Sequence, residues 1–266
     1  MNMIVCIKQV IDPEAPLSSF KIDPATNKVV PQAGVPFVIS PFDEQAVEAA
    51  LKIKDAKGGK VTVISLGINL LRDIIKKPIA MGADEIILLE DPAFTDGDSW
   101  STAYALAAAI KKVGQFDLIF CGRQAADWDA GQVGPYIAEI LGIPQVTLAK
   151  KVEAIDGKVK VEKVTSDGYE VIEVPTPALI TVSNELGEPR FATFKGTMAS
   201  KKKEPIIWKP ADIGVDPAKI GAKGSRTKMR KLFQPVRAGK CEIITGQNEE
   251  EAAVNLAKKL VEVNLL

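Results

Sequence analysis

Unbroken apolar runs alternate with amphipathic helical patterns over the first 150 or so residues of this chain of 266. Runs without polar alternation are typical of strands buried on both faces, and strand–helix repetition favours a parallel sheet. We therefore predict an α/β domain with helices on both faces of a parallel sheet. The expected strands are residues 4–7, 61–66, 85–89 and 117–121, and the expected helices are residues 42–57, 70–81, 99–112 and 134–141.

One strand–loop–helix unit carries the strongest functional signal. The apolar run 118–121 stops at Gly122, a small and polar loop follows, and a helical pattern begins at Gly134. Backbone N–H groups and a helix N-terminus can bind phosphate in this geometry. The loop matches neither G-x-G-x-x-G nor G-x-x-x-x-G-K-[ST], the two common phosphate-loop types. It predicts a nucleotide site of another kind, at the sheet edge where Gln9, Gly67 and Gly122 follow their strands.

A second helix start would open at the same edge. Ser40 and Asp43 fit a Ser-x-x-Asp cap, with Pro41 at the first helical position. We interpret this pattern as a helix cap that also has a share in the nucleotide site.

Composition excludes several catalytic classes. The chain has no histidine, so Ser-His-Asp and Cys-His nucleophiles, His-ligated metals and imidazole acid–base catalysis are absent. The cysteines, Cys6, Cys121 and Cys241, lack metal-ligand spacing, and we interpret them as small buried thiols. No set of carboxylates or lysines is arranged for hydrolysis or group transfer.

Charge and hydropathy restrict the classes of partner and the cellular location that we expect. Lys plus Arg equals Asp plus Glu at 34 each, whereas proteins that bind nucleic acid usually carry a basic excess. No apolar run reaches the ~18 residues that a membrane span needs, and no signal-peptide pattern opens the chain. We therefore expect a cytoplasmic protein that neither binds nucleic acid nor inserts into a membrane.

The pattern changes after about residue 150. Residues 152–164 predict a β-hairpin, and residues 168–174 and 178–182 predict two more strands. Residues 184–237 are rich in Lys, Pro and Gly and show little periodicity, which suggests an extended segment lying on another molecule. The last predicted helix, residues 249–263, has an apolar stripe that must pack against something. This tail indicates an obligate partner.

Several segments resemble, in order, the β subunit of electron-transfer flavoproteins (the FixA family). They are VCIKQV at 5–10, SPFDE at 40–44, residues 71–84, GRQAADWDAGQVG at 122–134, DGYEVIEVPTPALIT at 167–181 and NELGEPRFAT at 184–193. The resemblance covers nearly the whole chain. It implies a Rossmann-like fold of the adenine nucleotide alpha hydrolase kind, with a β-rich extension and a C-terminal arm.

The family implies an obligate heterodimer with an α subunit, which holds a redox-active FAD near the interface. The β subunit binds AMP in many members and a second FAD in electron-bifurcating members. Such a chain is an electron carrier between an acyl-CoA dehydrogenase or similar flavin dehydrogenase and another redox partner. It is not an independent enzyme, and NADH oxidation would belong only to a bifurcating form. We accordingly divide the chain into a nucleotide-binding domain (1–183), a recognition loop and extended segment (184–237) and an arm that packs on the α subunit (238–266).

The resemblance also implies which residues bind the nucleotide. We expect the N–H groups of residues 130–133 to meet phosphate, and Ser40 and Asp43 to bind polar adenine or ribose groups. Carboxylates beside a phosphate are unfavourable, so Asp127 and Asp129 are expected to brace the N–H groups of their own loop. The implied contacts are Cys6, Ser40, Pro41, Phe42, Asp43, Leu66, Gly122, Arg123, Gln124, Ala125, Asp127, Asp129, Ala130, Gly131, Gln132 and Val133.

A recognition loop, by which the family binds dehydrogenases, maps to residues 190–199. Its anchor is usually a leucine followed by proline, and here these positions hold Phe194 and Lys195. A phenylalanine fills an apolar pocket equally well, but the change bears on which dehydrogenase binds. The implied partner contacts are Arg190, Phe191, Phe194, Lys195 and Met198.

The identity of the nucleotide stays open at this stage. Residues 11–24 form a longer, Pro-rich loop than in familiar members, and KIDP at 21–24 and QVGP at 132–135 resemble the bifurcating branch. Trp128 and the Ala130-Gly131 pair do not. Two readings of other classes are a stand-alone adenine-nucleotide module of the stress-protein kind and an ATP pyrophosphatase. The first needs G-x-x-G followed by G-[ST], and the second needs SGGxDS where this chain has KQVIDP.

Overall fold

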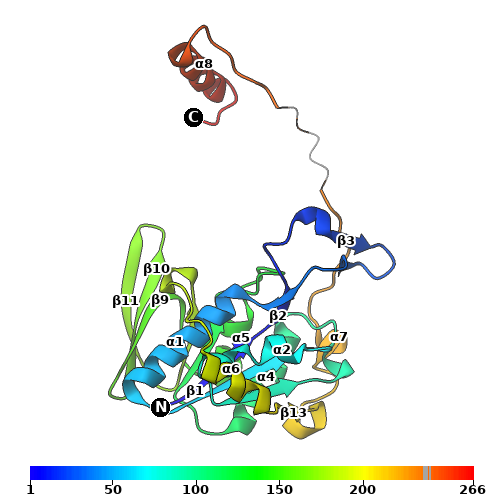
Figure 1. Cartoon of the computed structure of the whole chain (residues 1–266), viewed down its shortest axis with the longest axis vertical. Helices are drawn as coiled ribbons and strands as arrows, with labels where there is room; N and C mark the ends of the chain where they lie inside the picture. Colours follow the sequence, from blue (N-terminus) through cyan, green and yellow to red (C-terminus); the bar gives the residue numbers. More distant parts are fainter. Residues whose placement is uncertain (236–238, 240) are drawn as a thin grey trace. The chain divides into compact units, whose positions relative to one another are not determined.

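The computed structural model describes residues 1–235, 239 and 241–266. They form two units, Met1–Arg230 and Lys231–Leu266, which we treat separately. The sheet strands of the first unit are β1 (Asn2–Ile7), β6 (Lys60–Leu66), β7 (Glu85–Leu89), β8 (Leu118–Gly122), β9 (Gln145–Ile155), β10 (Lys158–Thr165), β11 (Gly168–Pro175), β12 (Ala178–Val182) and β13 (Ile206–Trp208). Within the described residues they make one nine-stranded sheet, ordered β11-β10-β9-β12-β8-β1-β6-β7-β13 (Figure 1).

Helices cover both faces of this sheet. They are α1 (Pro41–Lys57), α2 (Arg72–Ile75), α3 (Lys77–Met81), α4 (Ser99–Val113), α5 (Val133–Leu141), α6 (Phe194–Lys202) and α7 (Gly221–Gly224). Successive side chains of a strand point to opposite faces, so Met3, Val5 and Ile7 of β1 join the core under α1 and α3. Ile4 and Cys6 join the core under α4 and α5. The predicted α/β fold with a two-sided core is confirmed.

The sheet is parallel in its centre and antiparallel at one end. β1 pairs in parallel with β6 and β8, and β12 pairs in parallel with β8 and β9. β10 then pairs antiparallel with β9 and β11, and Gly157 supplies the positive φ of the turn between β9 and β10. The predicted β-rich extension is therefore a continuation of the central sheet, and the predicted hairpin is confirmed.

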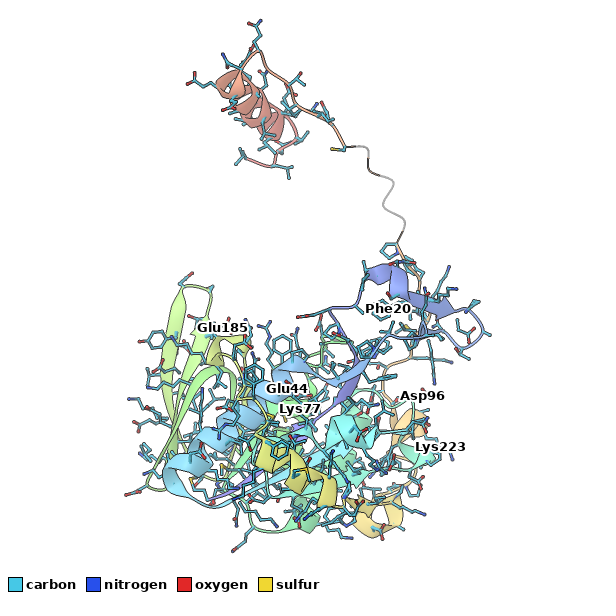
Figure 2. All side chains as sticks on the ribbon, in the orientation of Figure 1. Phe20, Glu44, Lys77, Asp96, Glu185 and Lys223 are labelled. Atoms are coloured by element: carbon cyan, nitrogen blue, oxygen red, sulfur yellow. The ribbon has the colours of Figure 1, made fainter. Side chains whose placement is uncertain are left out.

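The Pro-rich excursion between β1 and α1 has structure of its own. A short strand pair, β2 (Gln9–Ile11) with β5 (Phe37–Ile39), closes its base. A hairpin of β3 (Phe20–Asp23) and β4 (Lys28–Pro31) lies beyond it. Lys28 of this hairpin forms a 2.6 Å ion pair with Asp96, and Figure 2 labels Phe20 and Asp96 on the two segments.

Two expectations about local structure are wrong. The single helix predicted over residues 70–81 is two short helices, α2 and α3, because Pro78 cannot continue the hydrogen bonding of a helix interior and instead stands in the first turn of α3. The segment 184–237 is not simply extended. It contains α6, and β13 adds to the central sheet beside β7, pairing Ile206 with Ile87. Residues 236 and 237, at the end of that segment, lie outside the described residues.

The second unit contains the predicted C-terminal helix. α8 (Glu249–Glu262) begins at Asn248, whose side chain accepts a hydrogen bond from the N–H of Glu251. Its expected apolar stripe includes Leu256, which stays 47% exposed, and no residue of α8 is buried. The packing of this stripe on the α subunit stays a prediction. Residues 238 and 240 of the arm lie outside the described residues. In the part of the chain that the structure describes, no helix combines the length and apolarity needed to cross a membrane.

Asp98 ties the last part of the first unit to α4. Its carboxylate accepts hydrogen bonds from Ser101 N at the helix start, and from Arg226 N and Thr227 N at 2.7 and 2.9 Å. The guanidinium of Arg226 lies over the ring of Trp100 at 3.5 Å. Partial burial opposes ionisation of Asp98, but these N–H donors outweigh it and lower the pKa of its carboxyl.

We expect Asp98→Ala to lower the free energy of unfolding by ~1–2 kcal/mol, because the helix loses its cap and residues 226–227 lose their acceptor. The lowered pKa means that this stability is present above pH ~4 and is lost as pH falls through the folded-state pKa. Denaturant unfolding of the full chain at pH 7 measures the loss. An Asp98→Ala variant as stable as wild type would show that the cap and the tie contribute nothing.

Candidate functional site

Asp43 joins the start of α1 to the ends of two strands. Its two carboxylate oxygens accept hydrogen bonds from Lys8 N at 2.8 Å and from Gly122 N at 3.0 Å. Lys8 directly follows β1, and Gly122 is the last residue of β8. Ser40 is the first residue before the helix, with Pro41 in its first turn, but the Ser40 side chain makes no cap hydrogen bond. The predicted Ser-x-x-Asp cap is wrong, because the buried strand ends need acceptors and Asp43 supplies them.

Gly122 is required by the closeness of α1 to β8. A Cβ atom at this position would lie 2.5 Å from Asp43 Oδ1 and 2.8 Å from the carbonyl carbon of Phe42. Ser40 Oγ in turn accepts a hydrogen bond from Ala126 N at 3.3 Å. The first part of the loop after β8 is thus bound to the first turn of α1.

The loop carboxylates bind side chains. Lys8 Nζ donates to both oxygens of Asp127 at 2.6 and 2.8 Å, and Gln124 Nε2 donates to Asp129 Oδ1 at 2.7 Å. The expectation that Asp127 and Asp129 brace backbone N–H groups is therefore wrong. Lys8 is not among the residues predicted for the nucleotide site. The signal was available, because Lys8 directly follows a strand at the ligand-binding edge.

Backbone donors gather where α5 begins. Residues 130–132 are exposed, and no acceptor among the described residues contacts the N–H groups of residues 130–133. Asp129 and Gly131 have positive φ values of 50° and 63°, which turn the chain into the helix. Gly134 lies so close to β12 that a Cβ atom would meet Thr181 Cγ2 at 2.7 Å. These unpaired donors and the helix dipole suit an anion such as phosphate.

The structure brings most of the predicted nucleotide residues to one edge of the sheet. Cys6 and Cys121 are partners in the register of β1 and β8, both buried, directly below this edge. Burial and a hydrogen bond to Cys6 raise the pKa of the Cys121 thiol, the bond to Cys6 being the larger cause. Leu66 ends β6, the other neighbour of β1. Cys241 is exposed, so the interpretation of all three cysteines as buried thiols is wrong for it.

Comparison with known proteins shows similarity over nearly the whole chain. The model of the electron transfer flavoprotein domain matches residues 28–213. The electron transfer flavoprotein subunit beta of Thermoanaerobacterium thermosaccharolyticum is 46% identical over 261 residues, which is 98% of each chain. The caffeyl-CoA reductase-Etf complex subunit CarD of Acetobacterium woodii is 41% identical, and the acryloyl-CoA reductase electron transfer subunit gamma of Anaerotignum propionicum is 36% identical, each over 100% of both chains.

The chain belongs to the electron transfer flavoprotein family. The segment that the resemblance assigned to partner recognition is anchored on α1 and α3, not on the Gly122 loop. Phe191 and Phe194 are 95% and 84% exposed, and Met198 of α6 is also exposed. Thr193 Oγ1 accepts a hydrogen bond from Gly196 N and caps α6.

Burial is the main influence on the ionisation of Asp43. It raises the pKa of this carboxyl to about 7, although the N–H groups of Lys8 and Gly122 oppose the shift. The folded-state pKa lies above the ordinary value near 4, so folding takes up a proton between these two pH values. The contribution of Asp43 to stability is therefore full below pH ~4 and is lost as pH rises through about 7.

We expect Asp43→Asn to flatten the pH dependence of stability. Asparagine does not titrate, so the variant lacks the Asp43 share of the fall in unfolding free energy, which is at most ~1.4 kcal/mol per pH unit. Denaturant unfolding of the full chain at intervals from pH 4.5 to pH 8, with wild type beside the variant, gives the two slopes. Equal slopes would show that Asp43 is ionised throughout and that its hydrogen bonds outweigh its burial.

Proposed function

We propose that this chain is the β subunit of a heterodimeric electron transfer flavoprotein and that the loop from Gly122 to Gly134 binds an adenine nucleotide. The observation that carries the nucleotide site is the set of unpaired N–H groups at residues 130–133, at the N-terminus of α5. The loop is fixed to α1 through Ser40 and Asp43, so these donors need no rearrangement of the sheet edge to meet a phosphate.

The residues at this edge suit different parts of a nucleotide. The N–H groups of residues 130–133 would hold phosphate, and Lys8 is a cation that an anionic ligand could draw from Asp127. Both oxygens of Asp43 are used by Lys8 N and Gly122 N, so its role is to hold the site together. FAD supplies the electron-carrying chemistry when it is bound, and the protein supplies position and electrostatics.

The α subunit is the expected obligate partner, and it would hold a redox-active FAD near the interface. The exposed apolar side of α8 in the arm suits that contact. A dehydrogenase of the acyl-CoA dehydrogenase type would dock on Phe191, Phe194 and Met198, with Arg190 and Lys195 beside them. A hollow of about 270 Å³ beside this segment gives such a partner a place for a side chain. Its lining includes the apolar Ile74 and Ala192 and the charged Glu44, Asp73 and Lys77.

The nucleotide of this subunit is AMP in a simple carrier and a second FAD in a bifurcating form, which would oxidise NADH at that FAD. The names of two relatives include a CoA reductase, which favours a flavin dehydrogenase of acyl-CoA substrates as the partner. We place the complex in the cytoplasm. A stand-alone stress-protein-like nucleotide module is the candidate of another class, and it would need no α subunit.

Nucleotide content decides between these forms. We expect the chain, co-expressed with its α subunit and purified, to release on denaturation either one FAD and one AMP per heterodimer or two FAD and no AMP. Chromatography of the released nucleotides against standards measures the ratio. The first ratio identifies a simple carrier and the second a bifurcating complex. A chain that purifies without a flavin-bearing partner, or that releases only ATP, would contradict the assignment.

The docking role of the exposed aromatics is tested by Phe194→Ala. Removing a ring that is 84% exposed should not disturb the fold, but it should raise KM for an acyl-CoA dehydrogenase partner about 10-fold or more, as loss of an interface anchor does. Steady-state electron transfer in the heterodimer measures KM, and nucleotide content should not change. Ile155→Ala, which truncates a half-exposed side chain at the end of β9, is the control. An unchanged KM would remove Phe194 from the docking surface.

A further inference from the structure

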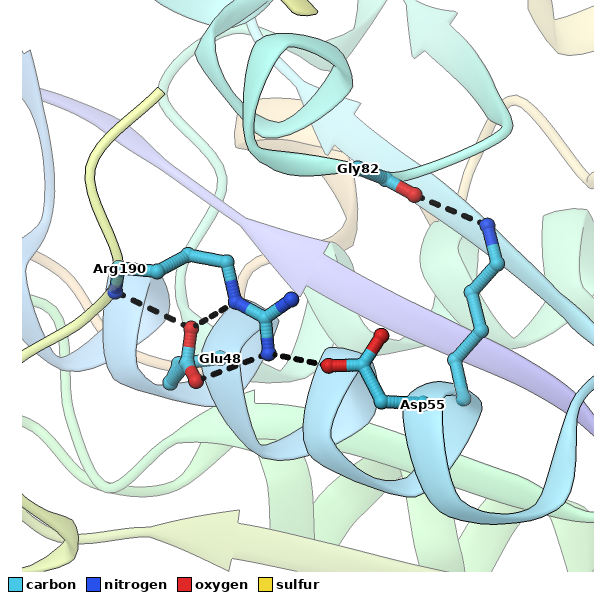
Figure 3. A network of polar contacts seen from close by, with 5 residues as sticks. Glu48, Asp55, Gly82 and Arg190 are labelled. Atoms are coloured by element: carbon cyan, nitrogen blue, oxygen red, sulfur yellow. Dashed lines mark hydrogen bonds and ion pairs between the residues drawn. The ribbon is translucent and has the colours of Figure 1, made fainter. Parts of the chain in front are cut away.

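A buried carboxylate on α1 holds the start of the docking segment, residues 190–199. Glu48 is only 4% exposed. Its Oε2 accepts hydrogen bonds from Arg190 N at 3.1 Å and Arg190 Nε at 2.8 Å, and its Oε1 accepts one from Arg190 Nη2 at 3.1 Å. Asp55, two turns further along α1, accepts another from Arg190 Nη2 at 2.8 Å (Figure 3). Glu48 therefore fixes both the main chain and the side chain of Arg190.

A second contact holds the segment six residues later. Gly196 of α6 lies against α3 so closely that a Cβ atom would collide with the carbonyl oxygen of Ala80. Lys76 beside α3 also forms a 3.2 Å ion pair with Glu204, just past α6. Residues 191–195 lie between the two contacts and are exposed throughout. Their own packing thus does little to define where Phe191 points, whereas Phe194 begins α6 and follows the capped start of that helix.

We propose that Glu48 is a positioning residue for partner docking, acting through Arg190 and not by contact with the partner. The inference rests on the proposed function of the segment. Three hydrogen bonds join Arg190 to the buried carboxylate of Glu48. They set the direction in which the main chain continues from its contact with α1, and Phe191 is the next residue. Ordering a segment before binding removes an entropy cost from association, so the clamp raises affinity without adding a contact.

A structural role alone would give a different result. Ion pairs in protein interiors often add little net stability, and their clearer effect is on geometry. Neutral glutamine at position 48 keeps the size of the side chain but presents an NH₂ group to a guanidinium N–H. One of the two hydrogen bonds from the Arg190 guanidinium to residue 48, which together form a fork, is then lost. The apolar packing of α1 and of the sheet below it is kept.

The experiment compares Glu48→Gln with wild type in the full heterodimer. Backbone ¹⁵N order parameters of residues 191–193, measured without any dehydrogenase, should fall in the variant to below about 0.6, the range of a flexible backbone. KM for an acyl-CoA dehydrogenase should rise about 10-fold, while kcat and nucleotide content stay at the wild-type level. The split between KM and kcat separates a positioning role from general loss of structure.

Other variants make the comparison independent of one substitution. Arg190→Lys keeps a positive charge beside both carboxylates and loses only the fork, so it should reproduce both effects even where Glu48→Gln folds poorly. Asp55→Asn should change KM by no more than about 2-fold, since Asp55 is exposed and bonds only one guanidinium nitrogen. Glu85→Gln, which removes the ion pair with Lys60 at the start of β7, is the remote control and should match wild type.

The outcomes separate the clamp from the docking assignment. Unchanged order parameters at residues 191–193 in both Glu48→Gln and Arg190→Lys overturn the clamp, whatever Phe194→Ala does. Lower order parameters with unchanged KM overturn the positioning role if Phe194→Ala raises KM. If Phe194→Ala leaves KM unchanged, the docking function itself fails, and a positioning role for Glu48 fails with it even where the order parameters fall.

Discussion

The hydrogen bonds of Asp43 are the constraint on which both functional regions depend. By accepting from Lys8 N and Gly122 N, this carboxylate fixes the start of α1 across the ends of β1 and β8. The Gly122 loop is then held beside that helix start. The same helix carries Glu48 and Asp55, which hold the docking segment through Arg190. One helix therefore sets the position of the proposed nucleotide site at its first turn and of the proposed docking surface along its length.

The sheet was readable from the sequence because its strands are buried on both faces. Unbroken apolar runs such as 118–121, short and followed by glycine, are typical of such strands, and the helices between them show their own periodicity. The failures share a cause. Pro78 divides into two helices the residues 70–81, whose apolar periodicity predicts one helix. β13 is three residues long, which is too short to show a periodicity. Its assignment depends on pairing with β7, a tertiary contact that no local pattern encodes.

Only part of the candidate site could be predicted from the sequence, for a similar reason. Glycine at 122 and a helix start after it are local signals, and the structure confirms both. The hydrogen-bond partners of the carboxylates could not be predicted in this way. A local rule made Asp43 a helix cap, but buried N–H groups at two strand ends compete for the same oxygens, and burial makes an unpaired N–H costly. The pairs of Lys8 with Asp127 and of Arg190 with Glu48 join positions more than 100 residues apart, so only the folded chain reveals them.

The exposed aromatics make physical sense only together with the clamp. Phe191 and Phe194 are apolar, and on a slack segment they would lower their free energy by collapsing onto the nearest apolar surface of their own chain. A segment held at Arg190 and again at Gly196 has less freedom to do this. The buried charge of Glu48 thus has a use that a hydrophobic pair could not replace, because a fork of directed hydrogen bonds fixes orientation whereas apolar contact does not. Under the proposed docking role, rings that are held in water are available for a partner to bury.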